Sequence, residues 1–275
     1  MDMTSTTLSP HVSSPVRARL PRSEAVLRVA AALIAAVCSA SGLVNPDQYR
    51  PVVSLAVLPG ALGQDAMALV LSMGLLVVTL LGRPSDRAAL PALAFLAYGY
   101  GIYSIERTVT ELYLAYFAAL ACATWALLLG AVRSVRATAE TEPVRGPGRV
   151  LVAAICGLTA VAFSAAWVTA LAPLVRSGSQ PTELWSVYLM DLCFVMPACA
   201  ASAWWIWRRD ARGRALGTLM TGLGAVMMAS LSLAEVCGPL AGLPAQPAAA
   251  LPTLVLTAVF ATGWVLLRPL RTRPV

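Results

Sequence analysis

The residues of this sequence best suited to chemistry are carboxylic acids that lie within or beside long apolar runs. Asp191 is the most distinctive of them. It stands seven positions after Leu184, which places it roughly 10 Å into a helix that rises about 1.5 Å per residue. An ionisable side chain at that depth in a bilayer usually faces a protein interior or a water-filled cavity. Asp191 is therefore a candidate for a functional polar site, and a structural bond between two helices is the alternative.

Two sequence neighbours strengthen the case for Asp191. Tyr188 stands three residues earlier on the same helical face, and we expect it to hydrogen-bond to the Asp191 carboxyl. Pro197 follows, and its ring frees the carbonyl of Cys193 from its helical bond, which predicts a kink. An acid, a tyrosine and an interrupted hydrogen-bond ladder thus fall within about two helical turns.

Further carboxylates are expected at the same side of the protein as Asp191. They are Asp47, Asp65, Glu106, Glu111, Glu183 and Glu235. Asp65, Glu111 and Glu183 each stand where an inward-running helix is expected to begin. A carboxylate in that position caps free N–H groups and meets the positive end of the helix dipole. Capping is therefore the simplest interpretation of these three acids.

Glu106 and Glu235 need another explanation, because both stand where a helix is expected to end. The helix dipole disfavours a negative charge there. Each side chain must therefore be solvated or paired, and the cations expected on that side are Arg50, Arg107 and Arg176.

A tyrosine-rich stretch, Tyr98 to Ser104, leads toward Glu106. Spacings of four and three place Tyr100, Ser104 and Arg107 on one helical face. Glycines in the stretch permit close backbone approach, and an interfacial aromatic belt is the alternative role for the tyrosines. The candidate polar site therefore comprises Asp191, Tyr188, Glu235, Glu106, Asp65 and Tyr100.

Membrane-spanning helices must position these residues. Hydrophobic residues make up 59% of the 275-residue chain, charged residues only 12%, and the mean hydropathy is +0.75. A soluble domain averages about a quarter charged residues. Crossing a hydrocarbon core of roughly 30 Å requires about 20 helical residues. Apolar runs near that length predict eight helices, at Ala25–Val44, Ala66–Gly82, Ala88–Ile105, Glu111–Val132, Val150–Val175, Leu184–Trp207, Ala215–Cys237 and Ala248–Leu267.

The arginines predict how these helices are oriented. Of the 20 basic residues, only Arg50, Arg107 and Arg176 fall in loops expected outside, so 17 lie in segments expected inside. Positive charge in short loops favours the cytoplasmic side. The sequence therefore predicts a multi-pass protein of the plasma (inner) membrane, with its N-terminus and its C-terminus both in the cytoplasm.

Polar segments divide the chain. Residues 1–24 are rich in Ser, Thr, Pro and Arg, which predicts a disordered cytoplasmic tail. A polar cytoplasmic linker, 133–149, separates four helices in 25–132 from four in 150–267, and a short cytoplasmic tail, 268–275, follows. The expected fold is an all-α, polytopic transmembrane helix bundle of about eight helices. Equal numbers of helices leave open that the halves form a parallel repeat of four helices each.

The sequence disfavours several other classes of function. The only histidine, His11, lies in the N-terminal tail, and the six cysteines form no C-x-x-C pair, so we expect no metal site. No nucleotide-binding motif is present, and no cofactor is expected. The net charge of +7 does not indicate nucleic acid, because the arginines are spread over every loop on one side.

The first outer segment, 45–64, is long and apolar for a loop but too short to cross a bilayer. We expect it to lie on the outer membrane surface or to fold over the bundle as a lid.

Several stretches carry a resemblance. They are Gly63-Gln64-Asp65, the tyrosine-rich third helix, Leu112-Tyr113-Leu114-Ala115-Tyr116, and Asp191-Leu192-Cys193-Phe194-Val195-Met196-Pro197 followed by Arg208-Arg209. With these stretches the chain resembles, from about Val37 to Glu235, a family of uncharacterised bacterial multi-pass membrane proteins. It departs from that family's pattern by carrying Gly99 and Thr110-Glu111 roughly where members carry Asn and Asn-Pro. The resemblance implies the membrane topology and no particular activity.

Three functions are consistent with these residues. The first is a small-solute or ion-coupled transporter, or an accessory subunit of one, whose acids bind a cation or carry a proton. The second is a membrane-embedded enzyme that acts on a lipid-linked or apolar substrate, with paired carboxylates as acid and base. The third is a structural or assembly partner that docks through Gly- and Ala-rich helices. The expected partners are the lipid bilayer, a small-molecule or ion ligand, and another membrane protein, with no nucleic acid.

Overall fold

The computed structural model describes most of the chain. The described ranges are 20–51, 53–82, 86–106, 111–139, 146–179, 185–244 and 248–268. Within them the chain is helical and contains no strand, which confirms the all-α expectation.

The described residues form eight helical rods, one of them made of three consecutive segments. The bounds are α1 Arg22–Val44, α2 Leu58–Leu80, α3 Asp86–Ile105, α4 Tyr113–Ala139, α5 Pro147–Ser177, α6 Trp185–Met190 with a π-helical segment Asp191–Val195 and α7 Met196–Trp207, α8 Ala211–Cys237 and α9 Ala250–Leu266. Seven of these rods are long and apolar enough to cross a membrane. The eighth, α9, has 17 residues and is thus about 26 Å long. The described residues therefore form a multi-pass helix bundle, as predicted.

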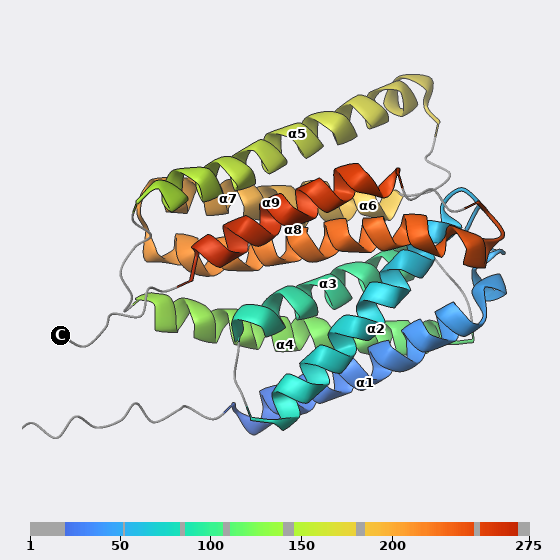
Figure 1. Ribbon diagram of the computed structural model, residues 1–275, viewed down its shortest axis with the longest axis horizontal. Coiled ribbons are helices and arrows are strands. Elements are labelled where there is room, and N and C mark those ends of the chain that lie inside the picture. The colour runs from blue at the N-terminus through green and yellow to red at the C-terminus, as the bar shows by residue number, and fades with distance from the viewer. Residues whose placement is uncertain are drawn as a thin grey trace, which may run out of the picture.

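Consecutive rods run in alternate directions, so α1 begins and α9 ends at the same end of the bundle (Figure 1). We call this end, near which Arg87, Arg133 and Arg268 lie, the arginine-rich end. The other end, where α3 finishes beside Glu106, is called the opposite end. Because the rods alternate in direction and are even in number, the first begins and the last finishes at one end, as the sequence predicted.

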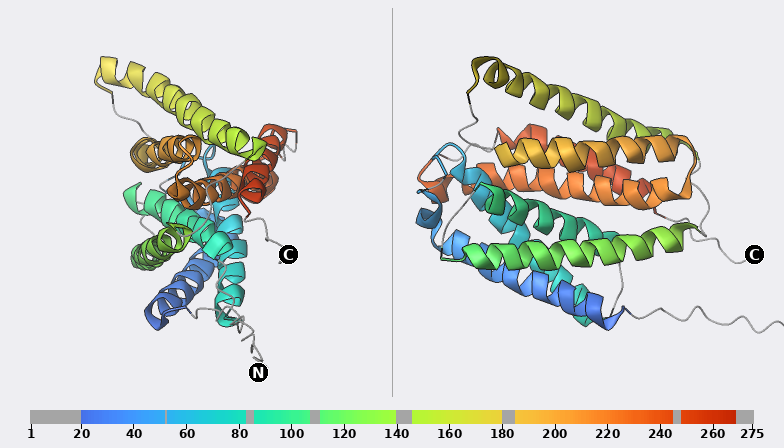
Figure 2. Two further views of the ribbon diagram at one scale, coloured as in Figure 1. Left: turned by 90° about the vertical axis from the view of Figure 1, so that its left-hand side faces the viewer. Right: turned by 180° about the vertical axis from the view of Figure 1, so that it is seen from behind.

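The first four rods lie together on one side of the bundle and the last four on the other, as Figure 1 and the views in Figure 2 show. Helix α8 joins the two groups, because it packs against α2, α3 and α4 as well as against α7 and α9. Helix α5 lies at the periphery and packs mainly on α7. The internal repeat stays a prediction.

Many helix faces that point away from the bundle are apolar. On α1, for example, Val26, Leu33 and Val37 are each half or more exposed. A soluble protein seldom shows such extended apolar surface, whereas lipid tails cover it without a free-energy penalty. The surface therefore agrees with a bilayer environment.

Several predicted boundaries were wrong by about two turns or less. Helix α2 begins at Leu58 instead of Ala66, so the second part of the expected loop is helical. Pro59 does not prevent this, because a proline in the first turn lacks only an N–H group that would have no helical partner. Helix α1 begins at Arg22, inside the expected tail. The expected linker is shorter than predicted, because α4 continues to Ala139 and α5 begins at Pro147.

Candidate functional site

A cavity of about 330 Å³ lies between the two groups of rods, toward the opposite end. It is bounded by α2, α3, α5, α6, the π-helical segment and α8. Most of its wall is apolar and rich in aromatic and methionine side chains. Its polar side chains are Gln64, Tyr98, Tyr103, Glu106, Asp191 and Ser230. Val53 and Val57 also line it, so the segment before α2 forms part of its wall, consistent with the expected lid.

Asp191 is the buried carboxylate of this cavity, with 4% of the residue exposed. The Tyr98 hydroxyl of α3 donates a hydrogen bond of 2.9 Å to Oδ1. The Trp167 indole N–H of α5 donates one of 2.8 Å to Oδ2. Each oxygen thus has one donor from a different helix, and hydrogen bonds of this kind stabilise the carboxylate away from water. Asp191 thus lines a cavity and also bonds to two other helices, so a functional site and a structural bond between helices both stay predictions.

The backbone around Asp191 departs from the α-helix. Residues Asp191–Val195 form a π-helical segment, in which the Met196 N–H donates to the Asp191 carbonyl. Pro197 explains the break, because it has no N–H group and its ring crowds the preceding turn. Single π-helical turns insert an extra residue and occur frequently at functional sites. The predicted interruption is therefore present, in the form of a π-helical turn that begins at Asp191 itself.

Tyr188 has a different role from the one predicted. Its ring packs edge-on against Trp167, with the ring centroids 5.1 Å apart and an interplanar angle of 72°. The tyrosine that bonds to Asp191 is Tyr98, from a helix 93 residues away in sequence. Tyr188 therefore acts on Asp191 through Trp167, by fixing the orientation of the indole ring.

Glu106 lines the same cavity and accepts hydrogen bonds from the backbone and the side chain of one residue on another helix. Its Oε1 accepts bonds of 2.9 Å from the Ser186 N–H and 2.5 Å from the Ser186 hydroxyl. Ser186 is in the first turn of α6, where free N–H groups and the helix dipole favour a negative charge. A carboxylate at the end of α3 thus caps the beginning of α6.

Asp65 does not cap α2, contrary to the prediction. It lies in the third turn of that helix and is 1% exposed. The Tyr49 hydroxyl donates to Oδ2 at 2.7 Å, and the Tyr103 hydroxyl contacts Oδ1 at 3.4 Å. Gly42 of α1 provides the space, since a Cβ there would lie 2.0 Å from Asp65 Oδ2. The early start of α2 caused this error.

Tyr103 links this buried acid to the cavity. It lines the cavity wall, and its hydroxyl also donates to the Ala61 carbonyl at 3.1 Å. Its ring stacks on Tyr49 with the centroids 5.7 Å apart. Asp65 therefore lies behind the cavity wall, with Tyr103 between it and the cavity.

The other predicted site residues are not brought to the cavity. The Tyr100 hydroxyl donates to the Ala35 carbonyl at 2.9 Å, which ties α3 to α1. Glu235 lies in the last turn of α8, outside the cavity lining. Glu111 is exposed before α4. Glu183 and Arg107 lie outside the described residues.

A second, smaller cavity of about 40 Å³ also borders Asp191. It reaches toward the arginine-rich end between α5, α7, α8 and α9, and its walls include Thr159, Met196 and Met220. A space of this size can hold a water molecule. Asp191 therefore stands at the boundary between the larger cavity and a space deeper in the bundle.

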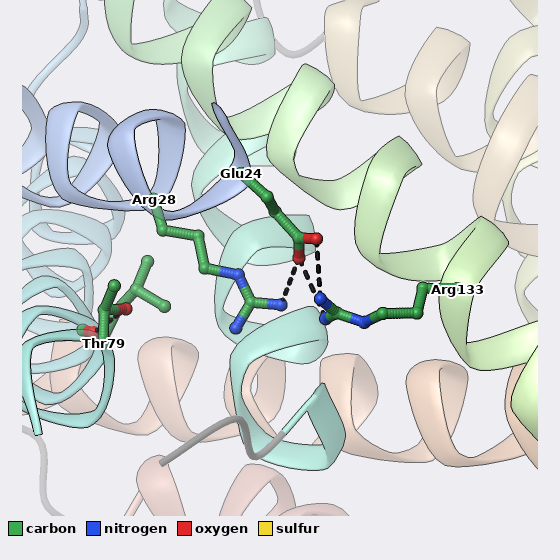
Figure 3. Close-up of polar contacts among 5 residues, drawn as sticks. Glu24, Arg28, Thr79 and Arg133 are labelled. Atoms are coloured by element: carbon green, nitrogen blue, oxygen red, sulfur yellow. Dashed lines mark hydrogen bonds and ion pairs between the residues drawn. The ribbon is translucent and has the colours of Figure 1, made fainter. Parts of the chain in front are cut away.

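Sequence reasoning missed an ion cluster near the arginine-rich end (Figure 3). The Glu24 carboxylate accepts a hydrogen bond of 2.6 Å from Arg28 and bidentate hydrogen bonds of 2.8 and 3.0 Å from Arg133. Glu24 and Arg28 are almost fully buried. Gly130 of α4 gives the cluster room, since a Cβ there would lie 3.2 Å from Glu24 Oε1. The spacing of four residues between Glu24 and Arg28 indicates that these two can pair on one helix. Nothing in the sequence indicates that Arg133 of α4 joins them.

Replacing Tyr98 with phenylalanine is expected to lower the free energy of unfolding by about 1–2 kcal/mol, because it removes the hydroxyl that satisfies Asp191 Oδ1. Tyr188→Phe is the matched control and should change stability by less than about 0.5 kcal/mol. Thermal unfolding of the purified protein in a neutral detergent would measure both. Equal losses in the two variants would contradict the assignment of Tyr98 as the partner of Asp191.

Among the described residues, no group of three or more His, Cys, Asp or Glu side chains is placed to hold a metal ion. Comparisons with models of protein families, with curated proteins and with solved structures found no match. The composition, the eight rods and the apolar surface together identify the chain as an all-α, multi-pass membrane protein.

Proposed function

We propose that this protein is a membrane transporter, or the solute-binding subunit of one, for a small, largely apolar solute that carries a cationic group. The observation that carries the proposal is Asp191, a buried carboxylate that borders the two cavities described above. An ionisable side chain inside a membrane typically marks a path for a solute, ion or proton.

The larger cavity supports binding of a small molecule. Its volume of about 330 Å³ lies in the range of ligand sites, which are usually apolar with a few convergent polar groups. Phe95, Phe163 and Trp167 supply aromatic faces that attract both apolar groups and cations. Asp191 and Glu106 are the acidic side chains of its wall, so a cationic solute is favoured over an anionic one.

The broken helix supports movement as well as binding. Interrupted helices beside a midplane site are a recurring feature of secondary transporters. Here the interruption, Asp191–Val195, coincides with the boundary between the two cavities. A small change in this segment would connect Asp191 with one cavity or the other. Release of a proton from Asp191 when the solute binds would couple transport of the solute to transport of a proton in the opposite direction.

The distribution of the arginines determines the orientation in the membrane that we propose with this function. We place the arginine-rich end in the cytoplasm and the larger cavity toward the outside of a plasma membrane, as the positive charge of the inner loops favours. We also propose, from the resemblance described above, that the chain belongs to a family of uncharacterised bacterial multi-pass membrane proteins.

Flux measurements in proteoliposomes test the proposal. The probe is benzyltrimethylammonium, because its permanent charge prevents passive diffusion and its ring matches the aromatic wall. We expect uptake above that of empty liposomes, driven by an outwardly directed proton gradient. Asp191→Asn should reduce it by about tenfold or more, since a charged contact worth about 1.5–3 kcal/mol is lost. Asp47→Asn removes an exposed carboxylate beside Arg50 and should leave the flux unchanged.

Binding separates the remaining functions. A probe-dependent change in fluorescence that disappears in Trp167→Phe, without flux, would support a binding subunit. Equal flux in the native protein and Asp191→Asn would exclude Asp191 from the pathway. The absence of both flux and binding would contradict the proposal and favour an assembly role. Chemical turnover of the probe would favour an enzyme.

A further inference from the structure

A second site lies near the arginine-rich end, where α3, α8 and α9 meet. Trp264 of α9 is in contact with two guanidinium groups. The Cζ atom of Arg87, in the first turn of α3, lies 4.6 Å from the centroid of the indole ring. The Cζ atom of Arg268, just after α9, lies 5.7 Å from the same ring. Stacking on one ring thus brings two positive charges together.

A third arginine joins them from α8. The charges of Arg214 and Arg268 both act on the Arg87 guanidinium. Packing explains this, because Pro91 of α3 and Trp264 both touch α8 at Gly222, where an added Cβ would lie 2.5 and 3.1 Å from them. Arg87 precedes Pro91 by about one helical turn, and Arg214 precedes Gly222 by about two. Three helices therefore direct arginines to one place.

The hydrogen-bond donors of this cluster lack acceptors among the described residues. Arg87 Nε and Nη2, Arg214 Nε and the Trp264 indole nitrogen are buried from solvent, and none has a hydrogen-bond partner there. Buried donors are normally paired in folded proteins. Like charges that are brought together repel one another, so an anion would both pair with these donors and reduce the repulsion.

Other arginines near this end are engaged within the protein. Arg133 contacts Glu24, Arg212 pairs with Asp210 at 2.6 Å, and Arg149 donates to the Trp207 carbonyl at 3.2 Å. These contacts show that the fold supplies acceptors to arginines elsewhere near this end. The buried donors of Arg87, Arg214 and Trp264 have no such acceptor among the described residues.

We infer that Arg87, Arg214, Arg268 and Trp264 bind a phosphate group, supplied by the head group of an anionic phospholipid. Guanidinium groups match phosphate oxygens in geometry and charge. The depth also fits a lipid, because Trp204 and Trp207 are exposed near the same end, and such tryptophans mark the level of the head groups. Basic pockets between transmembrane helices recognise anionic head groups in this way.

Lipid binding to the full chain in a neutral detergent tests the inference. Dioleoyl phosphatidylglycerol, dioleoyl phosphatidylcholine and inorganic phosphate are titrated separately, and bound lipid is counted by native mass spectrometry. We expect phosphatidylglycerol to bind more tightly than phosphatidylcholine, and added salt to weaken it. Arg87→Gln with Arg214→Gln should reduce its affinity by about 25-fold, at about fivefold for each arginine.

Controls distinguish the site from general attraction of charge. Arg136→Gln removes an exposed arginine in the last turn of α4 and should leave lipid affinity unchanged. If the double variant fails to fold, Arg268→Gln alone, at an exposed position, should still reduce affinity by about fivefold. Binding of inorganic phosphate with the same arginine dependence would support the phosphate site and assign a free anion as its source. Equal affinity for the two lipids, or unchanged affinity in the folded variants, would overturn the inference.

Discussion

Gly63→Ala is expected to lower the free energy of unfolding by about 2 kcal/mol, even though alanine is the better helix former. Gly63 is the point where α2 crosses α8. A Cβ there would lie 2.5 Å from the Ala234 backbone nitrogen and 2.6 Å from the Ser230 carbonyl oxygen. Both obstacles belong to the α8 backbone, which cannot move aside as a side chain can. The two helices must therefore separate, and overpacking of this kind typically costs about 1–3 kcal/mol.

Gly74 of the same helix supplies the matched control. A Cβ at Gly74 would meet nothing within 4 Å. Gly74→Ala should therefore stabilise the protein by up to about 1 kcal/mol, the difference in helix propensity. Unfolding in mixed detergent micelles, followed by circular dichroism, would compare the two variants. Equal stability of the two variants would refute close contact of the backbones at this crossing.

A second substitution sharpens the prediction. Ala234→Gly should not rescue Gly63→Ala, because the nearest atoms of Ala234 are its backbone nitrogen and Cα rather than its methyl group. Separation of α2 from α8 would also displace Gln64 of α2 and Ser230 of α8, which both line the cavity. Reduced probe binding is therefore expected together with the loss of stability.

Glu24→Gln is expected to lower the free energy of unfolding by about 3 kcal/mol or more. The Glu24 carboxylate contacts two guanidinium groups, and Arg28 is fully buried beside it. Removing one partner of a buried ion pair leaves the other charge uncompensated, which typically costs about 3–5 kcal/mol. The loss should appear as early unfolding of α1 from α4, since Glu24 and Arg133 join these two helices.

The matched control is an exposed pair. Asp47 contacts Arg50 at 2.6 Å, with the two side chains 74% and 52% exposed. Asp47→Asn should therefore change stability by less than about 1 kcal/mol. Arg28→Met in the Glu24→Gln background should recover part of the loss, because it removes the buried charge. If Glu24→Gln and Asp47→Asn have equal effects, the burial of Glu24 has no energetic consequence.

The broad architecture could be predicted because it depends on local properties of the chain. A run of about 20 apolar residues must be helical in lipid wherever it lies in the protein. Eight such runs predict alternating helices with both chain ends at one end of the bundle. The place of Asp191 inside a long apolar helix and the break before Pro197 follow from position along a single helix, and both were predicted.

The candidate site was predicted only in part. Asp191 and Glu106 both line the cavity, but Tyr100 and Glu235 do not. Asp65 was misplaced because an apolar segment containing Pro59 and Gly60 has the composition of a loop, although it forms the start of α2. Gly63 of this segment packs against the backbone of α8, and no local pattern in the sequence indicates that contact.

The sequence by itself determined that the chain forms long apolar helices and that consecutive helices run in alternate directions. The tertiary structure alone decided which partners those acids have, such as Tyr98 and Trp167 for Asp191 or Ser186 for Glu106. The reason is physical. In water, a helix shows its buried face by apolar periodicity, whereas in lipid both faces are apolar. The rotation of each helix about its axis is then set by packing alone, and that rotation decides which side chains meet.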